Sequence, residues 1–209
     1  NQTTPYLKNH IGLNNVINKN DTVAGASYAV IQTLNQLQGM SGNLIGKYVL
    51  GADIDATATS GWNNGQGFNP IGNSSNRFTG KFDGLNHTIS NLNINRANQY
   101  YVGLFGVTNN ATIQNIGLIQ ANIKGNLGVG ALIGEANSTN TSNAFSTGLV
   151  NGDVGVGGLV GRNLNQSNIL SSYSNAQVTA TNNFVGGLSG ANQNSSRIEN
   201  SYATGAVQA

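Results

Sequence analysis

The sequence predicts an all-β protein folded as a right-handed parallel β-helix, a solenoid, with one short helix near residues 28–38. Two observations carry this prediction: a repeat in the second half and a composition rich in Asn and Gly. The repeat segments VGLFG, VGALIG, VGGLVG and VGGLSG start 27, 27 and 29 residues apart, at Val102, Val129, Val156 and Val185. Such a fixed period indicates a solenoid or a propeller, but a propeller blade needs about 40 residues or more. The shorter period fits one coil of a β-helix.

The composition supports many tight corners. The chain has 36 Asn and 29 Gly among its 209 residues, and only 8% of its residues are charged. Asn and Gly favour turns and left-handed backbone positions. We therefore expect Asn side chains to stack at the corners and to share amide hydrogen bonds between coils. Hydrophobic residues make up 38% of the chain, more than disordered segments carry, so the chain is predicted to fold.

Charge and cysteine content exclude several functions. The net charge is only +2, and the nine basic residues form no run, which argues against nucleic-acid binding. The absence of cysteine excludes disulfides and thiolate metal sites. No apolar run approaches the roughly 18 residues of a transmembrane helix, so no membrane-spanning segment is expected.

The repeats predict which side chains form the core. The invariant leucine of each repeat is expected to stack inside the solenoid, whereas the variable residue after it is expected to be the more tolerant position; these leucines are Leu104, Leu132, Leu159 and Leu188. A second column of aliphatic residues recurs 27, 28 and 29 residues apart, at Ile123, Val150, Val178 and Val207. A third column holds aromatic residues, and its members Tyr173 and Tyr202 are also predicted to be core.

The first half is less regular. Ser27 is a plausible N-cap and Gly39 a stop for the predicted helix, because apolar residues recur between them at helical spacing. A strand follows from Tyr48. Residues 56–76 form a long insertion rich in Gly, Asn, Ser and Thr that holds the only tryptophan, Trp62. Long insertions in compact domains are often functional loops.

The domain organisation follows from these segments. Residues 1–209 are expected to be a single β-helical segment of a larger protein, since the chain opens without Met or a signal peptide. Residues 1–101 would form irregular coils with the helix and the insertion. Residues 102–209 would form the regular repeats.

Several motifs resemble a known family. VGGLVG together with NSYATGAV resembles the GLUG repeat of bacterial surface proteins. LQGMSGNLIGKYVLGADIDATATSGWNNGQGFNPIG, followed by FTGKFDGLNHTISNLNINR, is similar to the filamentous-haemagglutinin-like exoproteins of two-partner secretion. The resemblance covers about residues 28–209. It implies a right-handed β-helix, export through an outer-membrane translocator, and a secreted or outer-surface location in a Gram-negative cell. It also implies attachment to host cells or other bacteria, and it supplies no catalytic residues.

The sequence gives little support for catalysis or for a cofactor. Polysaccharide-cleaving β-helices need clustered carboxylates. Only Asp53 and Asp55 lie close in sequence, and Asp83 follows about one coil later, so a shared cation is a weak alternative to solvent-facing and turn roles. The two histidines, His10 and His87, are far apart, and no HExxH motif is present. The catalytic part of metallopeptidases that carry GLUG repeats is therefore not predicted here.

The function predicted from the sequence is an adhesin segment, a rigid and monomeric rod that presents polar and aromatic side chains to a host-cell receptor or glycan. The expected exposed anchors are Trp62 in the insertion and Tyr100 with Tyr101, because a few anchors carry most of the energy at an interface. The alternative is a purely structural stalk spacer whose binding activity lies elsewhere in the full protein. A β-helical carbohydrate-active enzyme is the third hypothesis.

Overall fold

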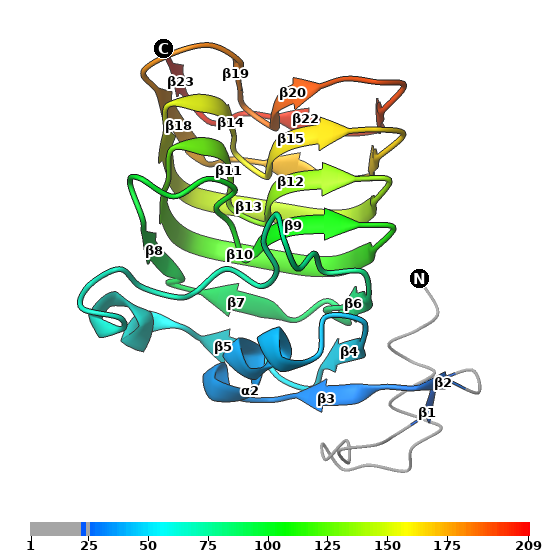
Figure 1. Ribbon diagram of the computed structural model, residues 1–209. Coiled ribbons are helices and arrows are strands. Elements are labelled where there is room, and N and C mark those ends of the chain that lie inside the picture. Colours follow the sequence, from blue (N-terminus) through cyan, green and yellow to red (C-terminus); the bar gives the residue numbers. More distant parts are fainter. Residues whose placement is uncertain (1–21, 24–25) are drawn as a thin grey trace.

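The fold is a parallel β-solenoid of about five turns, as predicted. A computed structural model describes residues 22–23 and 26–209 (Figure 1). Its coils stack along one axis, with the first described coil at one end and the last repeat at the other. Strands β1 (Thr22–Val23) and β2 (Ala26–Ser27) form a separate antiparallel pair, and the other strands pair in parallel.

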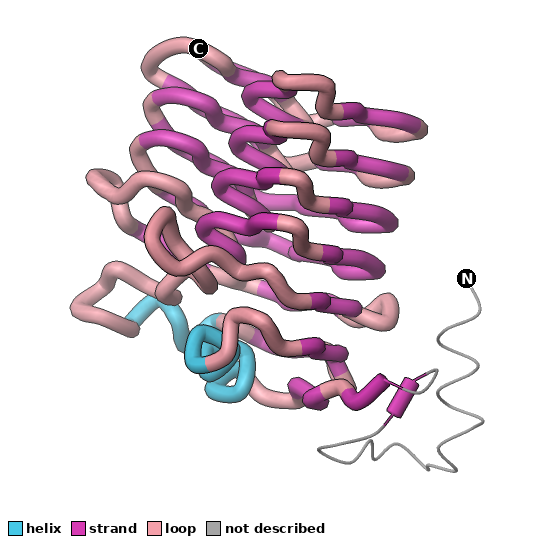
Figure 2. Tube along the Cα trace, turned by 45° about the vertical axis from the view of Figure 1, so that its right-hand side comes forward, coloured by secondary structure: helices cyan, strands magenta, loops and turns pink. Residues whose placement is uncertain are grey.

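Three sheets form the walls of the solenoid, and their strands lie in columns along the axis (Figure 2). The large sheet contains β3 (Ala29–Ile31), β4 (Lys47–Leu50), β5 (Ile54–Asp55), β6 (Lys81–Asp83), β7 (Thr88–Ser90), β8 (Asn93–Asn95), β10 (Thr112–Lys124), β13 (Asn140–Gly152), β16 (Asn168–Leu170), β17 (Tyr173–Ser174), β18 (Gln177–Ala180), β21 (Arg197–Glu199), β22 (Tyr202–Ala203) and β23 (Val207–Gln208). The two smaller sheets contain β11 (Leu127–Gly130), β14 (Val154–Gly157) and β19 (Val185–Gly186), and β9 (Phe105–Asn109), β12 (Ile133–Asn137), β15 (Val160–Leu164) and β20 (Ser189–Asn192).

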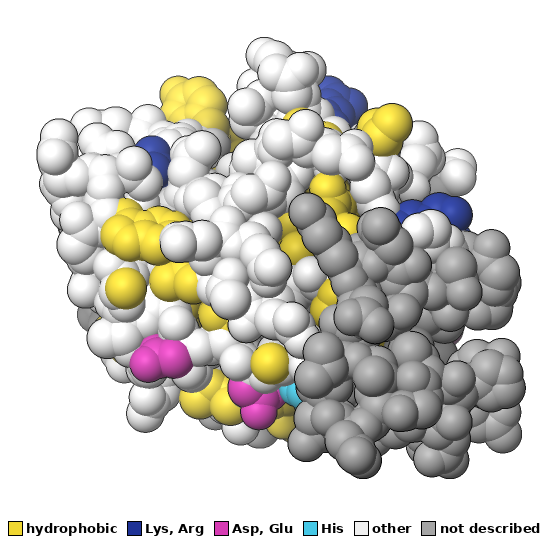
Figure 3. All heavy atoms as spheres, turned by 90° about the horizontal axis from the view of Figure 1, so that it is seen from below, with side chains coloured by type: hydrophobic (Ala, Val, Ile, Leu, Met, Phe, Trp, Pro, Cys, Tyr) yellow, Lys and Arg dark blue, Asp and Glu magenta, His cyan; other side chains and the backbone are white. Residues whose placement is uncertain are grey.

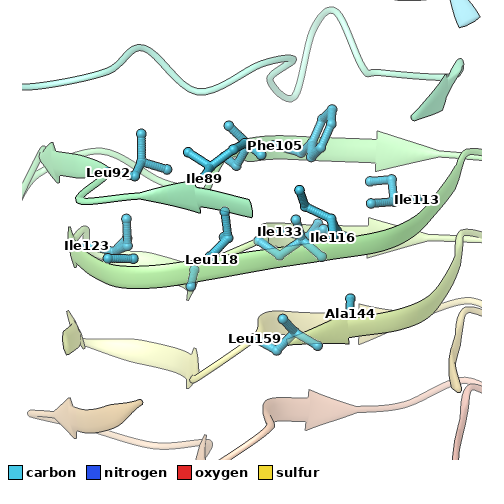
Figure 4. Close-up of a cluster of buried hydrophobic side chains, with 14 of the residues drawn as sticks. Ile89, Leu92, Phe105, Ile113, Ile116, Leu118, Ile123, Ile133, Ala144 and Leu159 are labelled. Atoms are coloured by element: carbon cyan, nitrogen blue, oxygen red, sulfur yellow. The ribbon is translucent and has the colours of Figure 1, made fainter. Parts of the chain in front are cut away.

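Aliphatic ladders fill the interior. Leu118 of β10 pairs in register with Ile89 of the preceding coil, and Figure 4 shows such side chains stacked coil on coil. The invariant leucines of the repeats are all buried, which confirms their predicted core role. The residues after them are equally buried in the first three repeats, and these are Phe105, Ile133 and Val160. Their tolerance to substitution stays a prediction. The chain bends at the repeat leucine, and this bend lets the valine, the leucine and its neighbour all reach the core.

The α-helix in the described part of the chain is shorter than predicted. Helix α2 spans Leu34–Gly39 and continues into the 3-10 helix η1, Met40–Gly42. The predicted N-cap Ser27 lies in β2, and the observed N-cap is Thr33, whose hydroxyl accepts from the backbone N–H of Gln36 at 3.3 Å. The Gln36 side chain accepts in return from the Thr33 N–H at 3.1 Å, which completes a capping box.

Asparagines form the predicted ladders at the corners. Asn115 and Asn143 have φ values of 55° and 50°, in the left-handed region that Asn tolerates better than other non-glycine residues. The Nδ2 of Asn143 donates to Oδ1 of Asn115 at 3.0 Å. At another corner, Asn165 donates to Asn137 at 2.7 Å and accepts from Asn194 at 2.8 Å. These bonds tie neighbouring coils together and account for much of the Asn content without a ligand.

The aromatic column lies on the outside of the large sheet, so the predicted core placement of Tyr173 and Tyr202 is wrong. Phe145 and Tyr173 stack with ring centroids 5.1 Å apart and planes 4° apart, and Tyr202 stacks on Tyr173 at 5.3 Å and 5°. Tyr202 is 57% exposed, whereas Tyr173 and Phe145 are partly covered. The column ends on Gly117, where a Cβ would lie 2.3 Å from the Phe145 ring. We call these three residues the outer aromatic ladder.

Candidate functional site

The insertion at residues 56–76 is a structured excursion anchored in the core. It begins with the 3-10 helix η2, Thr57–Gly61, whose buried Thr59 hydroxyl donates to the Ala56 carbonyl and accepts from the Asn93 N–H at 2.9 Å. Further along, Phe68 and Ile71 are fully buried in the main core. The insertion therefore holds its exposed part in a fixed position against β8.

Trp62 lies at the centre of this exposed part. Its ring is partly buried and stacks on Phe68, with centroids 6.3 Å apart and planes 19° apart. Trp62 lines an open hollow of about 660 Å³. The other side chains around this hollow are polar: Gln38, Ser41, Asn63, Gln66, Asn69 and Arg96. We call this hollow the Trp62 groove.

Hydrogen bonds hold the side chains of Gln38 and Asn63 in the Trp62 groove. The Gln38 side chain donates to the Asn69 carbonyl and accepts from the Asn69 N–H, both at 2.9 Å. Asn63 donates to the Gly67 carbonyl at 2.7 Å. The first coil is thereby joined to the insertion, although Gln38 and Asn69 are 31 residues apart in the sequence. The groove is thus largely formed before any ligand arrives, which lowers the entropic cost of binding.

Arg96 is the only charged residue of the Trp62 groove. Its Nε donates to the Phe68 carbonyl at 3.1 Å, and its Nη1 donates to Gln66 and Gln99 at 3.2 Å each. Burial lowers the pKa of the Arg96 guanidinium, which nevertheless stays protonated at neutral pH. Among the described residues, Arg96 forms no ion pair with a carboxylate. A cation is thus held in place by neutral acceptors.

Two neighbouring hollows share residues with the Trp62 groove. Ser41 and Asn69 also line a neighbouring hollow of about 350 Å³, and Gln66 and Arg96 also line another of about 560 Å³ that reaches Gln99. No Asp, Glu or His side chain lines these three hollows. The arrangement can bind an extended polar ligand, and it offers no general acid or base.

The two tyrosines predicted as anchors have different environments. Tyr100 is 60% exposed and contacts Tyr101 edge to face, with centroids 6.3 Å apart. Tyr101 is partly buried, and burial together with the nearby Glu135 carboxylate raises the pKa of its phenol. Glu135 accepts in turn from Arg162 at 2.7 Å. Tyr101 is therefore engaged within the fold, and Tyr100 is the free one of the pair. Neither lines the Trp62 groove.

The three acidic residues weighed as cation ligands are each occupied by protein donors. Asp53 accepts from the Thr88 N–H at 2.8 Å, and this bond lowers the pKa of its carboxyl. The pKa of Asp55 is lowered chiefly by the Thr57 hydroxyl. Asp83 accepts from two side-chain amides of β10. Within residues 22–23 and 26–209, no three His, Asp or Glu side chains gather as metal ligands. His10 lies outside the described residues.

Sequence reasoning identified Trp62 but missed Arg96, Gln38 and Asn69. A signal for Arg96 was present, since residues 84–123 contain no other Lys, Arg, Asp or Glu. The surface elsewhere carries few charges: the face seen in Figure 3 is mostly uncharged, with isolated basic and acidic groups. No helix in the described part of the chain is long and apolar enough to cross a membrane.

Comparison with known proteins places these features in a family. The model of the M26 IgA1-specific metallo-endopeptidase N-terminal region matches residues 8–148, and that of the GLUG motif matches residues 181–208. The GLUG part of the predicted resemblance is thereby confirmed. Halomucin of Haloquadratum walsbyi is 41% identical over 65% of this chain, and an immunoglobulin A1 protease of Streptococcus sanguinis is 34% identical over 60%. The matched stretches make up only 2% and 6% of those proteins.

The fold is also found in a solved structure. A Bacteroides ovatus protein described as a candidate immunoglobulin A1 protease superposes with a TM-score of 0.63 over 86% of this chain and 68% of its own, at 22% identity. At this identity the match supports the fold alone. The family model, in contrast, covers more than half of the sequence. The chain therefore belongs to the family of the M26 IgA1-specific metallo-endopeptidase N-terminal region.

Proposed function

We propose that this chain is an adhesive segment of a secreted or cell-surface protein, and that it binds glycans through the Trp62 groove. The observation that carries the proposal is the partly exposed Trp62 ring among fixed amide side chains. An aromatic ring offers apolar area for the C–H face of a sugar, whereas amides donate to and accept from its hydroxyl groups. Binding sites commonly combine such an apolar surface with a few placed polar groups.

The solenoid supplies the rest of the mechanism. Its ladders of Asn, Val and stacked aromatic residues continue from coil to coil, and they hold the groove on a stiff support. A rod of this kind projects a binding site away from its anchor. The relatives support an extracellular location, since one of them is named for cleaving an antibody class that is found outside cells. Kinship with filamentous-haemagglutinin-like exoproteins, a Gram-negative outer surface and a two-partner translocator stay predictions from the sequence motifs.

The test is glycan binding by the 209-residue chain and by its Trp62→Ala variant. We expect the chain to retain a defined set of glycans on an array, and we expect Trp62→Ala to weaken the tightest of them at least about tenfold, as loss of a hot-spot aromatic does. Tyr202→Ala is the control, because it removes another exposed aromatic outside the groove. Equal binding by the chain and by Trp62→Ala, with unchanged urea unfolding midpoints, would remove the groove from the proposal.

A structural spacer is the second candidate, favoured by the uninterrupted ladders of the repeat half. If the chain binds neither glycans nor cells on any array, the spacer function is the one supported. Proteolysis of immunoglobulin is not proposed for this segment, whose sequence has no HExxH motif.

A further inference from the structure

We infer that the Trp62 groove takes an acidic glycan, with Arg96 binding the carboxylate of a sugar residue next to the ring of Trp62. This assignment rests on the proposed glycan-binding function and deepens it. It depends on three features of the groove: a guanidinium with unused donors, the absence of acidic residues from the lining, and two neighbouring hollows that share residues with the groove.

The guanidinium of Arg96 retains unused donors. Its Nε and Nη1 are bonded to the Phe68 carbonyl and to two glutamine side chains, as described above. Its Nη2 has no hydrogen-bond partner among the described residues, and it is not among their buried atoms that lack one. Both N–H groups of Nη2 can therefore donate to a ligand. Because the other nitrogens are held, binding costs little side-chain ordering.

Charge complementarity selects an anion. Arg96 is the only charged residue that lines the three connected hollows, and a cation partly withdrawn from water gains more from an anionic partner than an exposed one does. Hydrogen bonds between a guanidinium and a carboxylate are roughly twice as strong as neutral ones. A neutral sugar would leave this charge unpaired, so the site discriminates between sugars that differ only in a carboxylate.

The shape selects a chain rather than a single small anion. Two neighbouring hollows share residues with the Trp62 groove, so a ligand bound at Arg96 can extend beyond the groove. Amide side chains line the path and suit sugar hydroxyl groups. A free anion such as acetate would contact Arg96 but would leave Trp62 and these amides unused.

The decisive measurement compares matched acidic and neutral probes. Titration calorimetry of the 209-residue chain would use 3′-sialyllactose against its methyl ester, and tetragalacturonic acid against its methyl ester. We expect at least one acidic probe to bind about ten times more tightly than its neutral partner, and we expect added NaCl to reduce this ratio. Arg96→Gln should bring the ratio of the acidic to the neutral affinity close to one. Arg96→Lys should keep part of the preference.

The matched control is Arg197→Gln, which removes the same charge from an exposed site on the last coil, where the side chain is 72% exposed. This control variant should leave the ratio of acidic to neutral affinity unchanged. Equal affinities within both probe pairs would overturn the acidic-glycan assignment while glycan binding stands, and so would an undiminished ratio in a folded Arg96→Gln variant. Tighter binding of sulfated lactose than of either carboxylated probe would also overturn it. If no glycan binds at all, the proposed function fails first and the assignment fails with it.

Discussion

The outer aromatic ladder gives a quantitative prediction about stability. Tyr173 has a stacked ring on each side, whereas Tyr202 has one, on Tyr173. Aromatic pairs contribute about 0.5–1.5 kcal/mol each beyond the area that they bury. Tyr173→Ala should therefore lower the free energy of unfolding by about 1–3 kcal/mol through stacking, and Tyr202→Ala by about half as much.

The assay is urea unfolding of the 209-residue chain, followed by far-UV circular dichroism and by the fluorescence of the single tryptophan. Tyr100→Ala is the control, since Tyr100 is exposed and has one edge-to-face contact. We expect the losses to rank Tyr173 first, Tyr202 second and Tyr100 last. A core tyrosine would cost about 3–5 kcal/mol, as large-to-small substitutions of buried aromatic residues do. Losses of that size at both ladder tyrosines, or equal losses at the two, would refute the stacking argument.

Two further predictions concern the backbone and pH. Gly148→Ala should destabilise the fold by about 2–5 kcal/mol, because the residue has φ 114° and its Cβ would lie 2.1 Å from the Ala121 carbonyl oxygen. Gly39→Ala is the control, because a Cβ at Gly39 would have no atom within 4 Å. It should leave the urea midpoint unchanged or raise it. The lowered pKa of Asp53 stabilises the fold above about pH 4, and this contribution disappears as the pH falls through the lowered value. Asp53→Asn should therefore reduce the difference between the unfolding midpoints at pH 7 and pH 2, and an unchanged difference would contradict this account.

The repeat spacing was sufficient to predict the solenoid, because each coil must return to the same register to pair with its neighbour. It also identified the valine and leucine ladders. The outer aromatic ladder was misplaced because large aromatic residues were equated with the core. The spacing within β13 indicated the correct placement, because Phe145 lies five residues before the buried Val150 in the same strand. An odd separation places two side chains on opposite faces of a strand.

The Trp62 groove could be predicted only in part. The insertion and its tryptophan stand out from the repeats, and so composition alone could single them out as candidates for binding. The contribution of Gln38 could not be inferred in this way. Its helix contacts Asn69 only because the chain comes back to the same side of the solenoid about one coil later. The same holds for Arg96, whose bond to the Phe68 carbonyl spans 28 residues. Contacts across coils depend on the register of irregular segments, and no repeat fixes that register in the first half.

The parallel pairing of successive coils has a mechanical consequence. The hydrogen bonds between coils run along the rod, so a force that pulls its two ends apart opens them one coil at a time. A folded coil occupies about 4.8 Å of length along the axis. Once released, its roughly 28 residues can extend to about 90 Å, at about 3.3 Å per residue. Under tension, such a rod would therefore lengthen in discrete steps, while the coils that remain folded keep their structure.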